Sequence, residues 1–82
     1  MPWIDIIWVH GPGGNVEHIE RNGVTMVEAE DVLREPIGIQ ISESSGRLIA
    51  FGDTDAGRRL AVVYEQVDLL TVYPVTAYEV ED

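Results

Sequence analysis

The apolar residues change their spacing at Pro36, and this change most limits what the chain can fold into. Between residues 24 and 33 they recur at the 3.6-residue period of a helix with one buried face. From Ile37 to Ile41 they alternate with Gly38 and Gln40, which is the two-residue period of a strand. The sequence therefore predicts helices before Pro36 and strands after it.

The N-terminal part predicts a strand, a turn and a short helix. Residues 3–9 are β-branched and aromatic, and the glycines of "GPGG" at 11–14 favour a turn. Asn15 is a suitable N-cap for a helix of about two turns. The pair Asn22-Gly23 suits the left-handed conformation that ends such a helix.

The second helix has a stronger local signature. Thr25 followed by Glu28 forms a capping box, and Pro36 stops the helix soon after Arg34. The predicted apolar stripe of this helix consists of Val24, Val27, Val32 and Leu33.

Four strands are predicted after Pro36. Residues 37–41 predict a strand with one buried face, followed by the polar turn "SESSG". The segments "RLIAFG" and "RLAVVYE" are apolar on both faces, as central strands are, and "DTDAG" joins them as a hairpin loop. Pro74 lacks a ladder donor, so the last strand, "LTVYPVTAYEV", is predicted at an edge or a bulge.

These elements predict one α+β domain over residues 1–82, with two N-terminal helices packed on one face of a mostly antiparallel four- to five-stranded sheet. No apolar run approaches the ~18 residues that would span a membrane. The start lacks a basic segment and a small-residue cleavage site, so it is interpreted as a strand and the expected location is the cytoplasm. The chain has no cysteine, so stability must come from packing.

The charge balance restricts the partners. Fifteen acidic residues oppose five basic ones, all arginine, for a net charge of -10. This field opposes nonspecific RNA or DNA binding, and the acidic surface is either solubilising or attractive to a basic partner. We expect weak RNA binding, no DNA binding and no membrane association.

Common catalytic motifs are missing. The "GPGG" turn has no lysine with which to form a phosphate-binding Walker loop, and His10 and His18 lack the spacing of metal ligands. The serines of the "SESSG" turn lie in no nucleophile elbow. No cofactor or metal is expected.

Two segments carry a resemblance to a known family. The turn Arg21-Asn22-Gly23-Val24, with a helix behind it, and the hairpin "RLIAFGDTDAGRRLAVVYE" are similar to those of BrnT toxins. Those proteins are small ribonucleases of type II toxin–antitoxin systems with a RelE-like fold. The resemblance covers most of the chain and implies that fold, an endoribonuclease activity and a basic antitoxin partner.

The family's motifs are only partly present. Asn22 stands where the family commonly has a histidine, and Tyr78 and Glu79 stand where it usually has two arginines. Arg47 and Arg59 match positions where the family tends to have basic residues. Each of these two arginines begins a strand, and the antiparallel hairpin predicts that the two starts lie at opposite ends of the strand pair.

RNA cleavage needs a base near the 2′-hydroxyl and cations at the phosphate. Arginines could stabilise the phosphate, while His18, Tyr78 or a carboxylate could serve as the base. Two functions therefore remain open: a BrnT-like ribonuclease with weakened or lost activity, and a noncatalytic acidic protein-interaction module in which the arginines form surface ion pairs. The candidate catalytic residues are His18, Arg21, Arg47, Arg58, Arg59 and Tyr78.

Overall fold

A computed structural model of the protein describes residues 4–80, which form two helices and five strands. The class is α+β, as the sequence predicts. The elements in chain order are β1 (Asp5–Ile6), α1 (Asn15–Arg21), α2 (Met26–Arg34), β2 (Gly38–Ile41), β3 (Leu48–Asp53), β4 (Arg59–Asp68) and β5 (Thr71–Glu79).

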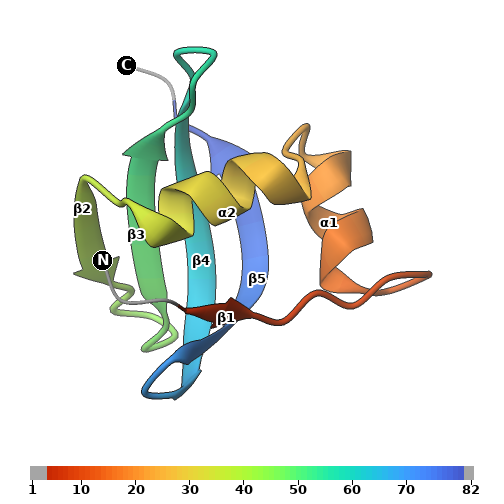
Figure 1. The fold of residues 1–82 in the computed structure, drawn as a ribbon. Coiled ribbons are helices and arrows are strands. Elements are labelled where there is room, and N and C mark those ends of the chain that lie inside the picture. The colour runs from red at the N-terminus through yellow and green to blue at the C-terminus, as the bar shows by residue number, and fades with distance from the viewer. Residues whose placement is uncertain (1–3, 81–82) are drawn as a thin grey trace.

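The strands form one mixed sheet with the order β1-β5-β4-β3-β2 (Figure 1). β1 pairs with β5 in parallel, and the other three pairings are antiparallel. The predicted central strands are therefore interior strands. The prediction for Pro74 is also confirmed: Val63 pairs with Thr76 and Tyr64 with Pro74, so Val75 is the extra residue of a bulge.

The core lies where α2 crosses β3 and β4, while α1 contacts β5 (Figure 1). Val32 of α2 packs closely on Gly52 of β3: a Cβ added to Gly52 would lie 3.3 Å from Cγ1 of Val32. The buried cluster consists of Ile19, Val24, Ala29, Val32, Leu33, Ala50, Leu60, Val62, Tyr64, Val72 and Ala77.

The predicted start and end of α2 are confirmed. The Glu28 backbone N–H donates to Thr25 Oγ1 at 3.2 Å, and the Thr25 backbone N–H donates to Glu28 Oε1 at 3.1 Å. The helix ends at Arg34, two residues before Pro36. The predicted stripe is wrong at Val27, which is exposed, whereas Ala29 lies in the core.

The prediction that Asn15 caps α1 is wrong. Gly14 is the N-cap, and the Asn15 side chain is buried. Its amide nitrogen donates to the carbonyls of Ile7 and Pro74, both at 2.9 Å, and its Oδ1 accepts from the Val9 backbone N–H at 2.7 Å. Asn15 therefore ties the N-terminal segment to β5. The predicted left-handed residue after α1 is confirmed, because Gly23 has a φ of 81°.

These contacts also explain why the first strand is shorter than predicted. Within residues 4–80, β1 contains only Asp5 and Ile6, and Trp3 lies outside the described residues. Beyond Ile6, the Ile7 carbonyl and the Val9 N–H bond to the Asn15 side chain. A side chain thus takes the place of the sheet partner that a longer strand would need.

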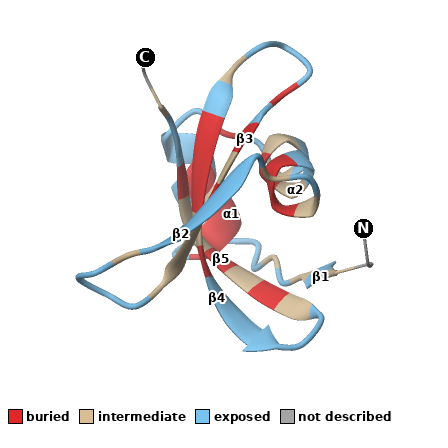
Figure 2. Ribbon diagram, turned by 90° about the vertical axis from the view of Figure 1, so that its left-hand side faces the viewer, coloured by how far each residue is buried: buried red, intermediate tan, exposed pale blue. Residues whose placement is uncertain are grey.

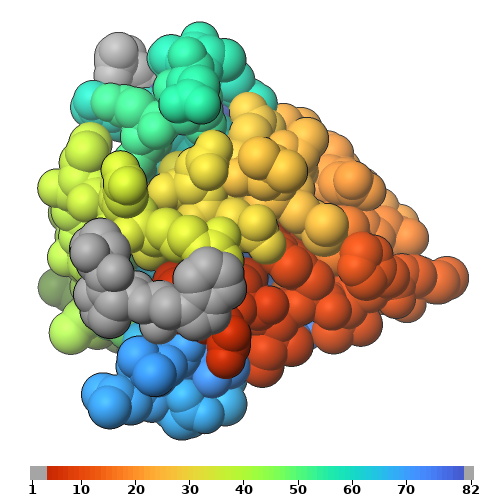
Figure 3. Space-filling model, viewed as in Figure 1, coloured from red at the N-terminus to blue at the C-terminus, as the bar shows by residue number. Residues whose placement is uncertain are grey.

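The prediction that the strand after Pro36 has one buried face is also wrong. Ile39 and Ile41 are in register with Ala50 and Leu48, so they lie on the side of the sheet that α2 covers. However, α2 lies over β3 and β4, and residues 37–41 stay at the margin of this surface (Figure 3). β2 is exposed along its whole length, whereas β3 and β4 contain buried residues (Figure 2).

Candidate functional site

Arg58 occupies a fixed position at the end of the β3–β4 hairpin. The Thr54 backbone N–H donates to the Arg58 carbonyl at 2.8 Å, and the Arg58 backbone N–H donates to Thr54 Oγ1 at 3.2 Å. Gly57, with a φ of 83°, allows the chain to reverse between them. The buried Thr54 side chain therefore holds the backbone from which the guanidinium extends.

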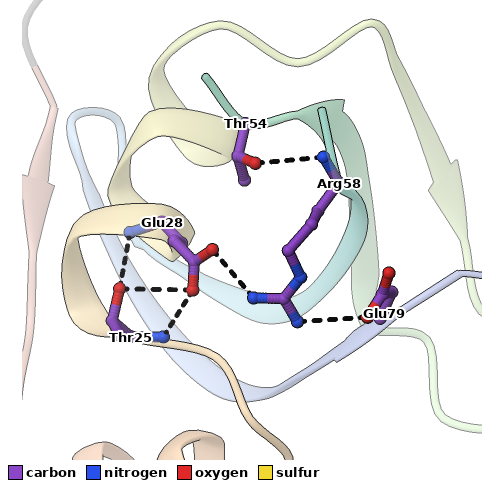
Figure 4. A network of polar contacts seen from close by, with 5 residues as sticks. All are labelled: Thr25, Glu28, Thr54, Arg58 and Glu79. Carbon is purple, nitrogen blue, oxygen red and sulfur yellow. Dashed lines mark hydrogen bonds and ion pairs between the residues drawn. The ribbon is translucent and has the colours of Figure 1, made fainter. Parts of the chain in front are cut away.

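The Arg58 guanidinium joins three separate elements (Figure 4). Its Nη1 donates to Glu28 Oε2 in the first turn of α2 at 2.8 Å. Its Nη2 donates to Glu79 Oε1 at the end of β5 at 3.3 Å. We name Thr25, Glu28, Thr54, Arg58 and Glu79 the Arg58 network.

The charges in the Arg58 network stabilise one another. The Thr25 backbone N–H has the largest effect and lowers the pKa of Glu28; burial partly opposes this, and Arg58 lowers the pKa further. Burial by itself would lower the pKa of Arg58, but the carboxylates of Glu28 and Glu79 raise it overall. Arg58 is therefore held by two ion pairs within the network, and a phosphate that bound its guanidinium would compete with the carboxylates of Glu28 and Glu79.

Arg59 follows directly in the chain but has a different partner. Its Nε and Nη2 donate to the two carboxylate oxygens of Asp53, at 2.9 and 3.3 Å. The hydrogen bond from Arg59 is the largest effect that lowers the pKa of Asp53. Because side chains alternate along β4, Arg59 lies on the opposite side of the sheet from Leu60 and the core. The adjacent arginines therefore do not form one cationic cluster.

Arg47 lies at the other end of the sheet, as the antiparallel hairpin predicts. It precedes Leu48, which pairs with Tyr64, whereas Arg59 pairs with Asp53. Asp53 lies five residue steps along β3 from Leu48, which is about 17 Å. Arg47 Nε donates to Glu65 Oε1 at 2.9 Å, and both residues line an open cavity of about 440 Å³.

The remaining predicted residues lie apart from Arg47: His18 and Arg21 are on α1, and Tyr78 is near the C-terminal end of β5. His18 is exposed on α1, and Arg21 Nη2 donates to Glu17 Oε1 at 2.9 Å. Tyr78 is exposed and pairs with Ala61, on the side of the sheet that carries Arg59. The structure thus places the six predicted residues on α1, on two sides of the sheet and at both of its ends.

A contact joins the turn after α1 to β5. The Asn22 amide nitrogen donates to Thr76 Oγ1 at 3.2 Å and to the Ala77 carbonyl at 3.0 Å. The turn from Arg21 to Val24 therefore lies against the strand segment that also carries Tyr78 and Glu79.

Sequence reasoning missed Glu28 and Glu79 as partners of Arg58. The sequence predicts Glu28 as part of a capping box, which is present, and nothing local shows that its second oxygen pairs with a residue 30 positions away. For Glu79 a signal existed: in a hairpin whose third strand returns antiparallel, the end of β5 lies beside the start of β4.

A second hollow of about 310 Å³ lies beside α2 and the β3–β4 loop. It is lined by Asp31, Arg34, Glu35, Asp53 and Asp55. Over residues 4–80, no three histidine, aspartate or glutamate side chains gather so that they could hold a metal ion. Neither helix of the described chain is long and apolar enough to cross a bilayer.

Searches of protein-family models, of curated proteins and of solved structures gave no match to this chain. The resemblance to BrnT toxins rests on the sequence motifs named above.

Proposed function

We propose that the protein acts by binding a basic protein partner and not by cleaving RNA. The observation that supports this proposal is the pairing of all five arginines with carboxylates of the same chain, at 3.4 Å or less. Arg58, the arginine that the fold positions most firmly, has two such partners.

The pairing matters because the carboxylates outnumber the arginines three to one. Each phosphate that approached an arginine would have to compete with a carboxylate already paired with it, within a protein of net charge -10. The same surplus of negative charge favours association with a basic partner. A cytoplasmic, noncatalytic interaction module is the function that fits these contacts best.

A second candidate is a ribonuclease toxin of the BrnT type with a RelE-like fold and a basic antitoxin. The contact of Asn22 with Thr76 and Ala77 favours it, because it joins the Arg21–Val24 turn to the end of β5. Arg21, Arg58 and Arg59 would then bind phosphates at separate points, because Arg58 and Arg59 do not form one cationic cluster. His18 or Tyr78 would serve as the base.

RNA binding separates the two candidates. We expect no tight binding of a single-stranded RNA by the parent at about 0.15 M salt, no cleavage of total RNA and no growth arrest on expression. The double variant Arg58→Ala/Arg59→Ala should behave like the parent in these assays. Arg47→Ala is the matched control at the far end of the sheet, and melting temperatures confirm that each variant is folded.

Submicromolar RNA binding by the parent at that salt concentration, lost in the double variant but kept in Arg47→Ala, would overturn the proposal. It would support the ribonuclease candidate.

A further inference from the structure

The outer edge of β2 is an exposed apolar edge. Within residues 4–80, β2 pairs with β3 and lies at the end of the sheet order, so its other edge has no strand beside it. Ile37, Ile39 and Ile41 are 62%, 53% and 69% exposed. Ile39 and Ile41 lie on one side of β2, and Ile37 directly precedes the strand, where its N–H donates to the Phe51 carbonyl at 2.7 Å. Together the three isoleucines form an apolar surface that a further strand could cover.

The backbone of this edge has hydrogen-bonding groups directed outward. The Ser42 N–H donates to the Arg47 carbonyl at 2.7 Å, which sets which residues of the strand bond to β3. Alternate residues of an antiparallel strand bond to the same neighbour, so Gly38 and Gln40 face β3. The N–H and C=O groups of Ile39 and Ile41 therefore point away from the sheet.

The four residues of β2 themselves lack the usual protection against pairing, although Pro36 precedes Ile37 in the chain. Natural edge strands are commonly blocked by charged residues, proline or bulges, but Gly38–Ile41 contains none of these. In a chain in which 24% of residues are charged, this stretch is uncharged. Exposed glutamates stand at its two ends, Glu35 before β2 and Glu43 after it.

We infer that the β2 edge binds an extended segment of the basic partner as a sixth strand, an inference that rests on the proposed function. The segment has apolar side chains at alternate positions, which cover Ile37, Ile39 and Ile41, and a basic residue at each end beside Glu35 and Glu43. Main-chain hydrogen bonds with Ile39 and Ile41 hold it, as in other cases of strand addition.

Charge favours this partner over a second copy of the chain. Two copies whose β2 strands paired with Ile39 opposite Ile39 would bring Glu35 of each copy to the end of the strand pair where Glu43 of the other lies, because these residues flank β2 on its two sides in the chain. Like charges directly opposite each other destabilise a strand pair, and each copy carries a net charge of -10. A basic segment turns both repulsions into attractions.

The test uses a blocked peptide, Arg-Thr-Val-Thr-Val-Thr-Val-Thr-Arg, whose two arginines are separated by the same number of residues as Glu35 and Glu43 and whose valines are placed to face the isoleucines. NMR hydrogen exchange on the full-length protein measures protection of individual amides. We expect saturable protection of the Ile39 and Ile41 amides. The control peptide with glutamate in place of both arginines should bind at least about tenfold more weakly at low salt.

Three variants test the site. Ile39→Pro removes an outward N–H but keeps Gly38 and Gln40, which bond to β3, and it should weaken peptide binding about tenfold. Ile41→Thr removes apolar surface and should also weaken it, which keeps the test decisive if Ile39→Pro unfolds. Val67→Thr, at an exposed valine of β4, is the matched control and should bind as the parent does.

Three results would overturn the inference. Absence of any protection by the arginine-ended peptide would do so. Protection of amides outside β2 would move the site and leave the proposed function intact. Protection of Ile39 and Ile41 that needs no peptide and rises with protein concentration would identify a second copy as the occupant. RNA cleavage by the parent would instead count against the proposed function.

Discussion

Two apolar strands that neighbour each other in the sheet, β3 and β2, have opposite environments. β3 lies under α2, with Gly52 against Val32 and Ala50 in the core. Ile39 and Ile41 of β2 lie on the same side of the sheet, in register with Ala50 and Leu48, and remain exposed. The comparison teaches that alternation specifies which side of a sheet a residue lies on, whereas burial depends on what covers that side.

The largest expected effect comes from placing a charge on each side of β4. Val62 is fully buried under α2, and Val63, its neighbour, points to the other side and is half-buried. Val62→Asp should cost about 4 kcal/mol or more and abolish cooperative folding, because the carboxylate would be buried without a partner. Val63→Asp should cost about 1–2 kcal/mol, because its carboxylate can stay hydrated.

Urea denaturation followed by circular dichroism measures both variants, with Val63→Thr as a control for the loss of the valine side chain. Equal losses of stability in the two aspartate variants would mean that a charge at Val63, on the side of the sheet opposite α2, is as poorly hydrated as a charge in the core.

The sequence predicts best what neighbouring residues decide. The capping box at Thr25 and Glu28, the turn at Gly23 and the bulge near Pro74 all depend on local backbone chemistry, and all are present. Asn15 was misjudged because its side chain bonds to the carbonyl of Pro74, 59 positions away. No local pattern contains that information.

The candidate site was predicted less well for the same reason. The antiparallel hairpin was enough to separate Arg47 from Arg59. The partners of Arg58 were not predictable, since Glu28 arrives on a helix whose position over the sheet is a tertiary property. Exposure of Val27 depends likewise on which face of α2 is turned toward the sheet, and exposure of the β2 isoleucines depends on how far α2 extends over the sheet.

A smaller difference in stability is expected between alanine substitutions at a glycine of β3, Gly52, and at a glycine of β2, Gly38. A Cβ at Gly52 would lie 3.3–3.4 Å from three atoms of Val32, including its Cα, whereas a Cβ at Gly38 would meet nothing within 4 Å. Gly52→Ala should therefore destabilise the protein by about 1–2 kcal/mol through overpacking. Gly38→Ala should change stability by no more than about 0.5 kcal/mol.

Midpoints of urea denaturation for the two alanine variants provide the comparison. If Gly52→Ala were as stable as Gly38→Ala, α2 would not be pressed against β3 as tightly as the structure shows.

The smallest effect concerns acid, and it compares the carboxylates that pair with Arg58 and Arg59. Both Glu28 and Asp53 have a lowered pKa, but the Glu28 side chain is 20% exposed and that of Asp53 is 48% exposed. A carboxyl group with a lowered folded-state pKa stabilises the protein above its unfolded-state pKa, and this contribution is lost as the pH falls through the folded-state pKa.

Glu28→Gln keeps a side chain that can complete the capping box, so it removes mainly the charge. It should be less stable than the parent near neutral pH, and the difference should shrink as the pH falls from about 5 to about 3. Asp53→Asn should show the same trend with a smaller amplitude, since solvent screens its pair with Arg59 more fully. Free energies of unfolding across this pH range measure both differences. A difference for Glu28→Gln that stayed constant with pH would show that the Glu28 charge does not stabilise the Arg58 network. A larger effect for Asp53→Asn would show that the more exposed ion pair, Asp53 with Arg59, stabilises the protein more than the pair of Glu28 with Arg58.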